Sequence, residues 1–294
     1  MLRSMFTAIG GLRNHQVMLD VTANNIANVN TVGYKAQRVN FEAMMSQTLR
    51  GASSPVTDGV GGSGPTQVGL GMQLGGIGSL LTQGSMQSTG QWSDIAVSGE
   101  GYFMVGDNLD PTTGQIISTT PPAAGDTNLM FTRAGNFTTD RDGNLVTQDG
   151  HYVLGLKMDN TATPPVLGTA LGKIQIPTDA QSVGVDKNGN VTVVQGSGPV
   201  IIGQIQLAKF PNDAGLQRMS GNKFQESQNS GAPTVLAPGV SGAGLITPGA
   251  VEMSNVDLAQ EFTNMITAQR GFQANSRVIS AADEMLQELV NLKR

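Results

Sequence analysis

The fold of this chain is decided by residues 254–294, which read SNVDLAQEFTNMITAQRGFQANSRVISAADEMLQELVNLKR. The segment has no proline, and its apolar residues recur at alternating steps of three and four. This spacing is typical of one face of a long helix. Ser254, with Asp257 three residues later, indicates a capping box at the start of that helix. The predicted apolar stripe consists of Leu258, Phe262, Met265, Phe272, Ile279, Leu286 and Val290.

The opposite end of the chain predicts a second amphipathic helix. Its stripe consists of Leu2, Met5, Ile9, Leu12, Leu19, Ala23 and Ile26, with Gln16 as the one polar member. Gly10 and Gly11 weaken this helix by roughly 1 kcal/mol each, so it depends on neighbouring structure. A helix with such an apolar stripe is not stable when the stripe is exposed to water. We therefore expect the two helices to pack on each other, or on other copies of the chain.

Between the two helices the sequence is typical of β structure. Short alternating runs are separated by turn pairs such as Asp142-Gly143 and Asn188-Gly189. The predicted class is α+β, with long N- and C-terminal helices paired in a coiled-coil-like module and a mainly β domain inserted between them. The expected parts are an N-terminal helix at 1–35, an extended linker at 36–90, a β-rich domain at 91–229, a return linker at 230–253 and a C-terminal helix at 254–294. Residues 106–128 are expected to form a surface excursion.

The composition argues against several classes of function. A net charge of −5 and a pI near 5.0 do not suit a nucleic-acid binder, which needs a basic face. With no cysteine, the chain forms no disulfide and no thiolate metal site. The only histidines are His15, which is expected to lie off the seam of the first helix, and His151. They are not spaced with other ligands as a metal site requires. No phosphate-binding loop, nucleophile elbow, cleavable secretory signal or membrane-inserting segment is predicted. We expect no enzyme activity and no cofactor.

Three segments carry a resemblance to a known family. They are ANNIANVNTVGYK at 23–35, GPTQVGLGMQLGGIGSLLTQGSMQSTGQWSDIAVSGEGYFMV at 64–105, and the C-terminal stretch at 254–294. Each resembles a motif of the flagellar rod and hook proteins, and the three occur in that family's order. Together they cover about a third of the chain. Motif matches at both ends of the chain and between them identify a family more specifically than one short motif does.

This resemblance implies a structural protomer, with an inner tube of terminal helices and a β domain outside it. It implies that copies of the chain form a homopolymer, which adjoins other flagellar axial proteins of the rod and the hook–filament junction. It also implies that the chain leaves the cell through the flagellar export apparatus. The wording of 64–105 and 254–294 favours the extracellular hook, the flexible joint that transmits torque from rod to filament. A distal rod protein of the basal body is the alternative, because the chain is short for a hook protein with a further outer domain. A secreted coiled-coil and β adhesin is the alternative from another class.

The resemblance also directs attention to Asn24, Asn25 and Asn28 in the first motif. We expect their amides to bond the backbone or a neighbouring subunit across a tight joint. We further expect the terminal helices to be largely disordered in the free monomer, because their stripes then lack partners.

Overall fold

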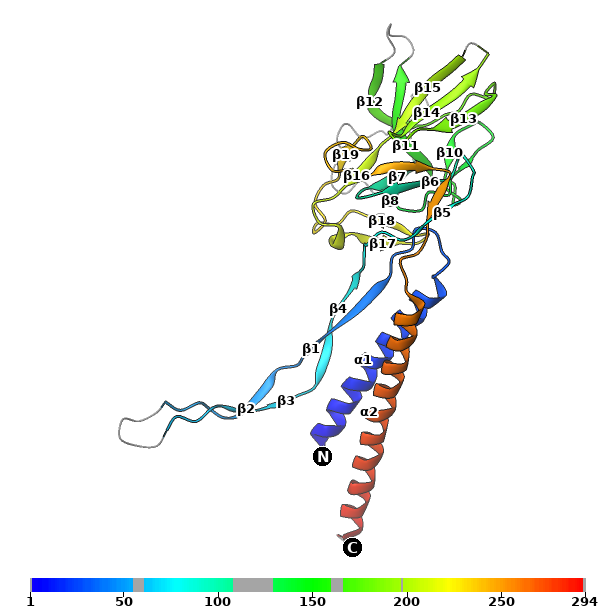
Figure 1. Cartoon of the computed structure of the whole chain (residues 1–294). Coiled ribbons are helices and arrows are strands. Elements are labelled where there is room, and N and C mark those ends of the chain that lie inside the picture. The colour runs from blue at the N-terminus through cyan, green and yellow to red at the C-terminus, as the bar shows by residue number, and fades with distance from the viewer. Residues whose placement is uncertain (1, 55–60, 108–128, 160–165, 197, 293–294) are drawn as a thin grey trace. The chain divides into compact units, whose positions relative to one another are not determined.

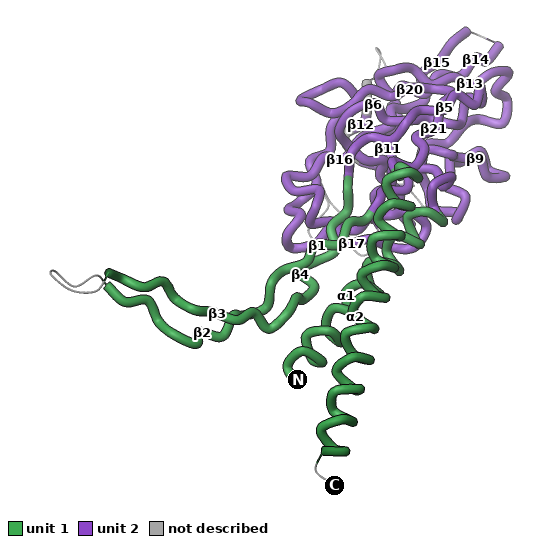
Figure 2. Tube along the Cα trace, turned by 60° about the horizontal axis from the view of Figure 1, so that its bottom comes forward, with its two compact units in different colours: residues 1–27, 37–80, 256–294 green, residues 28–36, 81–255 purple. Residues whose placement is uncertain are grey.

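The computed structural model describes residues 2–54, 61–107, 129–159, 166–196 and 198–292. Most of the surface excursion expected at 106–128 lies outside these residues. The chain forms two compact units (Figure 2). We call residues 1–27, 37–80 and 256–294 the helical unit, and residues 28–36 and 81–255 the β unit. The predicted α+β class, with an N-terminal helix, a mainly β domain and a C-terminal helix, is confirmed.

The helical unit consists of two long helices and two β ribbons (Figure 1). Helix α1 spans Leu2–Ala27 and α2 spans Leu258–Leu292, so at 1.5 Å per residue they are about 39 and 52 Å long. The segment expected as an extended linker contains both ribbons. Their strands are β1 (Gln37–Ala43) paired with β4 (Met72–Ser79), and β2 (Ser46–Arg50) paired with β3 (Thr66–Gly69), all antiparallel.

The start of α2 differs from the predicted capping box. The carboxylate of Asp257 accepts hydrogen bonds from the backbone N–H groups of Ala259 at 2.9 Å and Gln260 at 3.3 Å. Asp257 is therefore the N-cap itself, and the helix starts one residue later. The prediction that Ser254 is the cap was wrong, because Asp257 already satisfies two free N–H groups of the first turn.

The β unit is built on one large antiparallel sheet of thirteen strands. Its main path runs β13-β14-β15-β11-β7-β8-β18-β17, and the remaining five strands pair at its sides. The strands of this sheet are β7 (Tyr102–Gly106), β8 (Leu129–Thr132), β9 (Thr138–Thr139), β10 (Leu145–Val146), β11 (Tyr152–Asp159), β12 (Val166–Lys173), β13 (Ser182–Val185), β14 (Asn190–Gln195), β15 (Gly198–Ile205), β16 (Leu207–Lys209), β17 (Gln217–Met219), β18 (Lys223–Gln225) and β19 (Thr234–Leu236).

Two smaller sheets and a short helix complete the β unit. Strand β20 (Leu245–Pro248) pairs with β6 (Ile95–Ser98), and β21 (Ala250–Glu252) pairs with β5 (Met86–Ser88). A 3-10 turn spans Asp213–Gly215. The last strands of the β unit in the sequence, β20 and β21, thus pair with two of its first strands, β6 and β5.

Strand β7 carries the core of the β unit on both of its faces. Phe103 and Val105 pack into one hydrophobic cluster, whereas Tyr102 and Met104 pack into a second. Successive side chains of a strand point to opposite faces, so one strand supplies both clusters. The chain's only tryptophan, Trp92, packs against the first cluster and is a natural reporter of its integrity.

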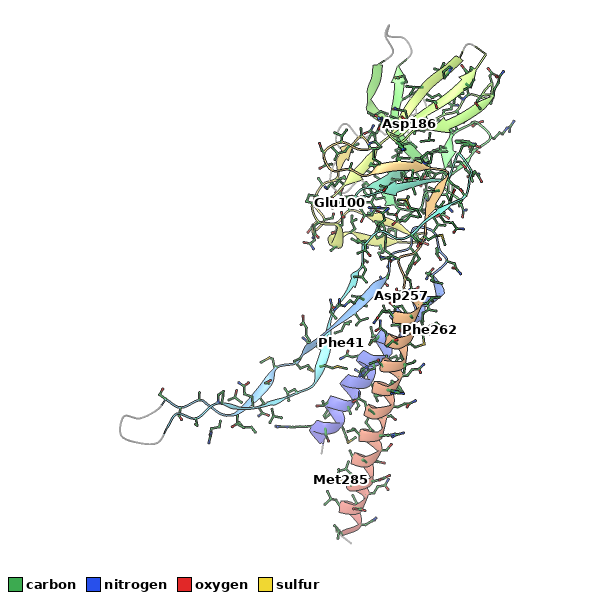
Figure 3. All side chains as sticks on the ribbon, viewed as in Figure 1. Phe41, Glu100, Asp186, Asp257, Phe262 and Met285 are labelled. Atoms are coloured by element: carbon green, nitrogen blue, oxygen red, sulfur yellow. The ribbon has the colours of Figure 1, made fainter. Side chains whose placement is uncertain are left out.

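The β unit contains one turn twice. Residues 140–144 (DRDGN) and 186–190 (DKNGN) form the same hydrogen-bonded loop, and Figure 3 labels Asp186 in the second copy. The side chain of Gln175 donates to the carbonyl of Asp142 at 3.1 Å, and that of Gln204 donates to Asn188 at 2.9 Å. Each turn is therefore held by a glutamine side chain from a segment later in the chain, Gln204 from β15 and Gln175 from an isolated bridge. The two turns share these contacts although the sequence has no repeat of fixed period.

Each copy of this turn requires glycine at its fourth position. Gly143 has φ +77° and Gly189 has φ +79°, and a Cβ at Gly143 would overlap the carbonyl oxygen of Ile176. We expect Gly143→Ala to lower the free energy of unfolding of the β unit by about 2 kcal/mol or more. Urea denaturation followed by Trp92 fluorescence measures this. Gly196→Ala is the control, because a Cβ there meets no atom within 4 Å, and it should change stability by less than about 0.5 kcal/mol.

Candidate assembly surface of the helical unit

Helices α1 and α2 pack side by side in one antiparallel register. Asn25 lies opposite Glu261, His15 opposite Gly271, and Gly11 opposite Asn275. Each step back along α1 is one step forward along α2. In this register Leu2 lies opposite Glu284, so the last two turns of α2 extend past the first residue of α1 (Figure 1).

The closest contacts between the helices are made by small and polar residues. A Cβ at Gly11 would lie 2.6 Å from Nδ2 of Asn275, and a Cβ at Gly271 would lie 2.5 Å from the ring of His15. Each glycine thus makes room for a polar side chain of the other helix. Ala268 and Ala282 are the fully buried apolar residues of α2. Such a seam brings the backbones close but buries little apolar area, so it stabilises the pair weakly.

Asn25 joins three elements of the helical unit and is fully buried. Its Nδ2 donates to the carbonyl of Gln37 at 2.8 Å and to Oε1 of Glu261 at 3.1 Å. Its Oδ1 accepts from the backbone N–H of Gln37 at 2.9 Å. One amide therefore connects α1, the start of β1 and the first turn of α2. The expected bonding of this amide to the backbone is present. Asn24 is exposed, and Oδ1 of Asn28 accepts from the Thr31 hydroxyl at 3.1 Å.

We expect Asn25→Ala to destabilise the helical unit strongly. The change removes three hydrogen bonds and leaves the Gln37 backbone groups and the buried Glu261 carboxylate without their partner. A loss of about 3 kcal/mol corresponds to a melting midpoint lower by roughly 10 °C or more. Helix melting of the assembled protein, followed by circular dichroism, measures it. Gln16→Ala, at an exposed amide position of the same helix, should leave the midpoint unchanged.

Most of the large apolar side chains of α2 lie outside the seam. On this helix the exposed ones are Leu258, Phe262, Ile266, Phe272, Val278, Met285, Leu289, Val290 and Leu292. Phe262 and Met285 are each 50% exposed and are labelled in Figure 3. Val278, Met285 and Leu292 are spaced by seven residues, so they share one face of the helix. An exposed apolar surface of this extent marks an interaction site.

The predicted stripe residues are divided between the seam and this outer surface. Half-buried in the helical unit are Met5, Ile9, Leu12, Leu19 and Ile26 of α1, and Met265, Ile279 and Leu286 of α2. Leu258, Phe262, Phe272 and Val290 are exposed, and the side chain of Leu2 lies outside what the structure describes. The periodicity thus located two apolar helices but did not identify the polar face by which they meet.

His15 has a different place from the one expected. It was taken to lie off the seam, but its ring packs on Gly271 of α2 and lies 6.3 Å from the ring of Phe41, in an edge-to-face arrangement. Its Nδ1 is buried and has no hydrogen-bond partner within the described residues. The residue is a packing element of the helix pair, which its spacing alone did not indicate.

A buried cluster of three charged residues in the β unit was missed by the sequence analysis. Glu252 Oε1 lies 2.6 Å from Nζ of Lys35, and Oε2 lies 3.3 Å from a guanidinium nitrogen of Arg133. All three side chains are almost fully buried. Burial lowers the pKa of Lys35, while its hydrogen bond to Glu252 opposes that shift. No local pattern indicates this cluster, because its members are far apart in the chain.

Within the described ranges we find no metal-binding arrangement. No group of three or more His, Cys, Asp or Glu side chains is close enough to hold a metal ion there. The described helices include none that is long and apolar enough to cross a membrane.

Three family models match the chain. Residues 5–35 match the flagella basal body rod protein model, 122–193 the flagellar hook protein FlgE/F/G D1 domain, and 247–292 the C-terminal model of the flagellar basal body rod FlgEFG proteins. The flagellar basal-body rod protein FlgG of Bacillus subtilis is 44% identical, with all of both chains covered. That of Caulobacter vibrioides is 37% identical, covering 99% of this chain and 100% of the relative. The flagellar hook protein FlgE of Borreliella burgdorferi is 29% identical, with both chains fully covered. The chain belongs to the family of flagellar rod and hook proteins.

Proposed function

We propose that this chain is a structural protomer of the distal flagellar rod, which assembles through its terminal helices and has no enzymatic role. The observation that carries the proposal is the outer apolar surface of α2, which no described residue of the same chain covers. A head-to-tail contact that does not close into a ring generates a helical polymer. Copies that bury this surface against one another form the inner tube of such a polymer.

Two observations support the rod over the hook, which was the first choice from the sequence. The rod protein of Bacillus subtilis aligns over 296 residues, almost the length of this chain. The alignment with the hook protein of Borreliella burgdorferi extends over 442 residues, so that relative contains long additions. The comparisons therefore favour the distal rod alternative, and the extracellular hook is the second candidate. An adhesin has no support among these relatives.

Locating the chain on purified hook–basal bodies tests the proposal. We expect antibodies against the β unit to label the straight shaft of the basal body. Label confined to the curved segment would assign the chain to the hook instead. Label on neither structure, in cells that swim normally without the protein, would reject the flagellar role.

A second measurement tests whether the helices need other copies. The polar seam stabilises the pair weakly, so we expect hydrogen exchange in dilute monomer to be fast across 2–27 and 258–292 and slow in the β unit. Both helical segments should become protected on polymerisation. Strong protection of both before assembly would contradict the proposed assembly mechanism.

A further inference from the structure

The segment that follows α1 is buried although it has no regular structure. Residues 28–36 contain no helix or strand, yet Gly33 to Ala36 are buried in the β unit. Its backbone is held at several points: Gly33 N–H donates to the carbonyl of Glu252 at 2.8 Å, and Ala36 N–H donates to Oδ1 of Asn255 at 2.8 Å. The segment is therefore docked residue by residue.

Lys35 and Asn255 meet at one place in this docked segment. Nζ of Lys35 donates to Oε1 of Glu252 at 2.6 Å and to the carbonyl of Thr82 at 2.8 Å. Nδ2 of Asn255 donates to the same carbonyl at 3.1 Å. We call these four residues the clasp. Two segments that are more than two hundred residues apart thus share one acceptor, which fixes the distance between residue 35 and residue 255.

The clasp holds the points from which the two helices leave the β unit. Asn28 follows the last residue of α1, and Asn255 precedes the cap of α2 by two residues. A fixed separation of these points limits how far one helix slides along the other. It also raises the effective concentration of each helix for the other.

The contacts between the two helices define their register less strongly than the clasp does. The α2 seam residues Ala268, Asn275 and Ala282 are spaced by seven, and all are small or medium in size. A slide of one heptad in either direction would place an alanine opposite Gly11, which accepts it without a clash. The contacts of Asn25 and His15 oppose this slide, but they are few.

We infer that Lys35 and Asn255 are positioning residues that set the register of α1 against α2 and thereby align the outer apolar surface for assembly. The claim that this register aligns the apolar surface for assembly rests on the proposed function. The claim that Lys35 and Asn255 set the register does not.

The chain has no cysteine of its own, so engineered disulfides can report the register. In the full-length monomer the weakly held helix pair opens and re-forms, and each disulfide traps the register in which the two helices meet. A Cβ at Gly11 would lie 2.9 Å from Cγ of Asn275, close to the Cβ-to-sulfur distance across a disulfide. The pair Gly11→Cys/Asn275→Cys therefore reports the native register. Gly11→Cys/Ala268→Cys and Gly11→Cys/Ala282→Cys report a slide of one heptad in either direction.

These three pairs are compared with and without Lys35→Met/Asn255→Ala. With the clasp intact, we expect the native pair to oxidise about tenfold faster than either shifted pair. In the clasp variant, we expect this ratio to fall toward one. Arg133→Met is the matched control. It removes the guanidinium that faces Oε2 of Glu252 but leaves the contacts of Lys35 in place, so the native pair should still oxidise about tenfold faster than the shifted pairs.

Trp92 fluorescence verifies in each variant that the β unit is folded. An unchanged ratio in a clasp variant with native Trp92 emission would overturn the inference. If that double variant loses the native emission, Asn255→Ala alone, which keeps the Lys35–Glu252 ion pair, is used, and an unchanged ratio there has the same meaning. Because the readout uses dilute monomer, failure of the rod assignment would leave this result standing.

Discussion

Phe262→Ser combined with Met285→Ser is expected to leave the monomer folded and to abolish its assembly. Both side chains are half exposed on α2 (Figure 3), so the β unit does not depend on them. In a polymer that covers them, burial of the exposed half of each side chain contributes about 0.8–1.5 kcal/mol. Loss of both weakens each protomer contact by about 1.5–3 kcal/mol, which raises the concentration needed for assembly about tenfold or more, so the variant fails to assemble at concentrations where the unaltered protein just polymerises.

Sedimentation of purified protein over a concentration series measures this effect, and swimming of complemented cells gives the consequence in vivo. Gln269→Ser with Gln273→Ser is the matched control, because both residues are exposed polar positions of the same helix. The control should assemble as the unaltered protein does. Normal assembly of the Phe262 and Met285 variant would mean that copies of the chain meet through another surface.

Glu252→Gln is expected to cause the largest loss of stability in the β unit. The carboxylate is fully buried between the ammonium of Lys35 and the guanidinium of Arg133. A neutral amide leaves these two cations buried beside each other without a counter-charge. Removing one partner of a buried ion pair costs about 3–5 kcal/mol.

Urea unfolding followed by Trp92 fluorescence measures this loss. The matched control is Glu100→Gln, which removes the carboxylate of a Lys–Glu pair of the same 2.6 Å length on the surface. An exposed pair contributes at most about 1 kcal/mol, so the two glutamine variants should differ several-fold in effect. Equal, small effects for both would show that the buried cluster does not stabilise the fold.

The sequence predicted more of the fold than of the site. Both helices, the α+β class and the turns at Gly143 and Gly189 follow from local signals, because periodicity and turn chemistry involve residues close in the chain. The N-cap was misplaced by three residues, since Ser254 and Asp257 both suit a cap and only the backbone geometry selects one.

The candidate site depended more on tertiary contacts. The motif around Asn25 drew attention to the right segment, but its bond to Glu261 joins residues 236 positions apart. His15 was misplaced because helical spacing assigned the apolar stripe to the seam, whereas in the structure the closest contacts of the seam are made by glycine, alanine and polar side chains.

The sequence by itself determined that both ends of this chain are amphipathic helices around a β insert, since a repeat of apolar residues is a local property that survives any arrangement of the rest. Only the tertiary structure decided which helix face turns inward and that Lys35, Arg133 and Glu252 share one buried site. Those outcomes depend on close packing and charge pairing between segments far apart in the chain, and no local pattern encodes such contacts.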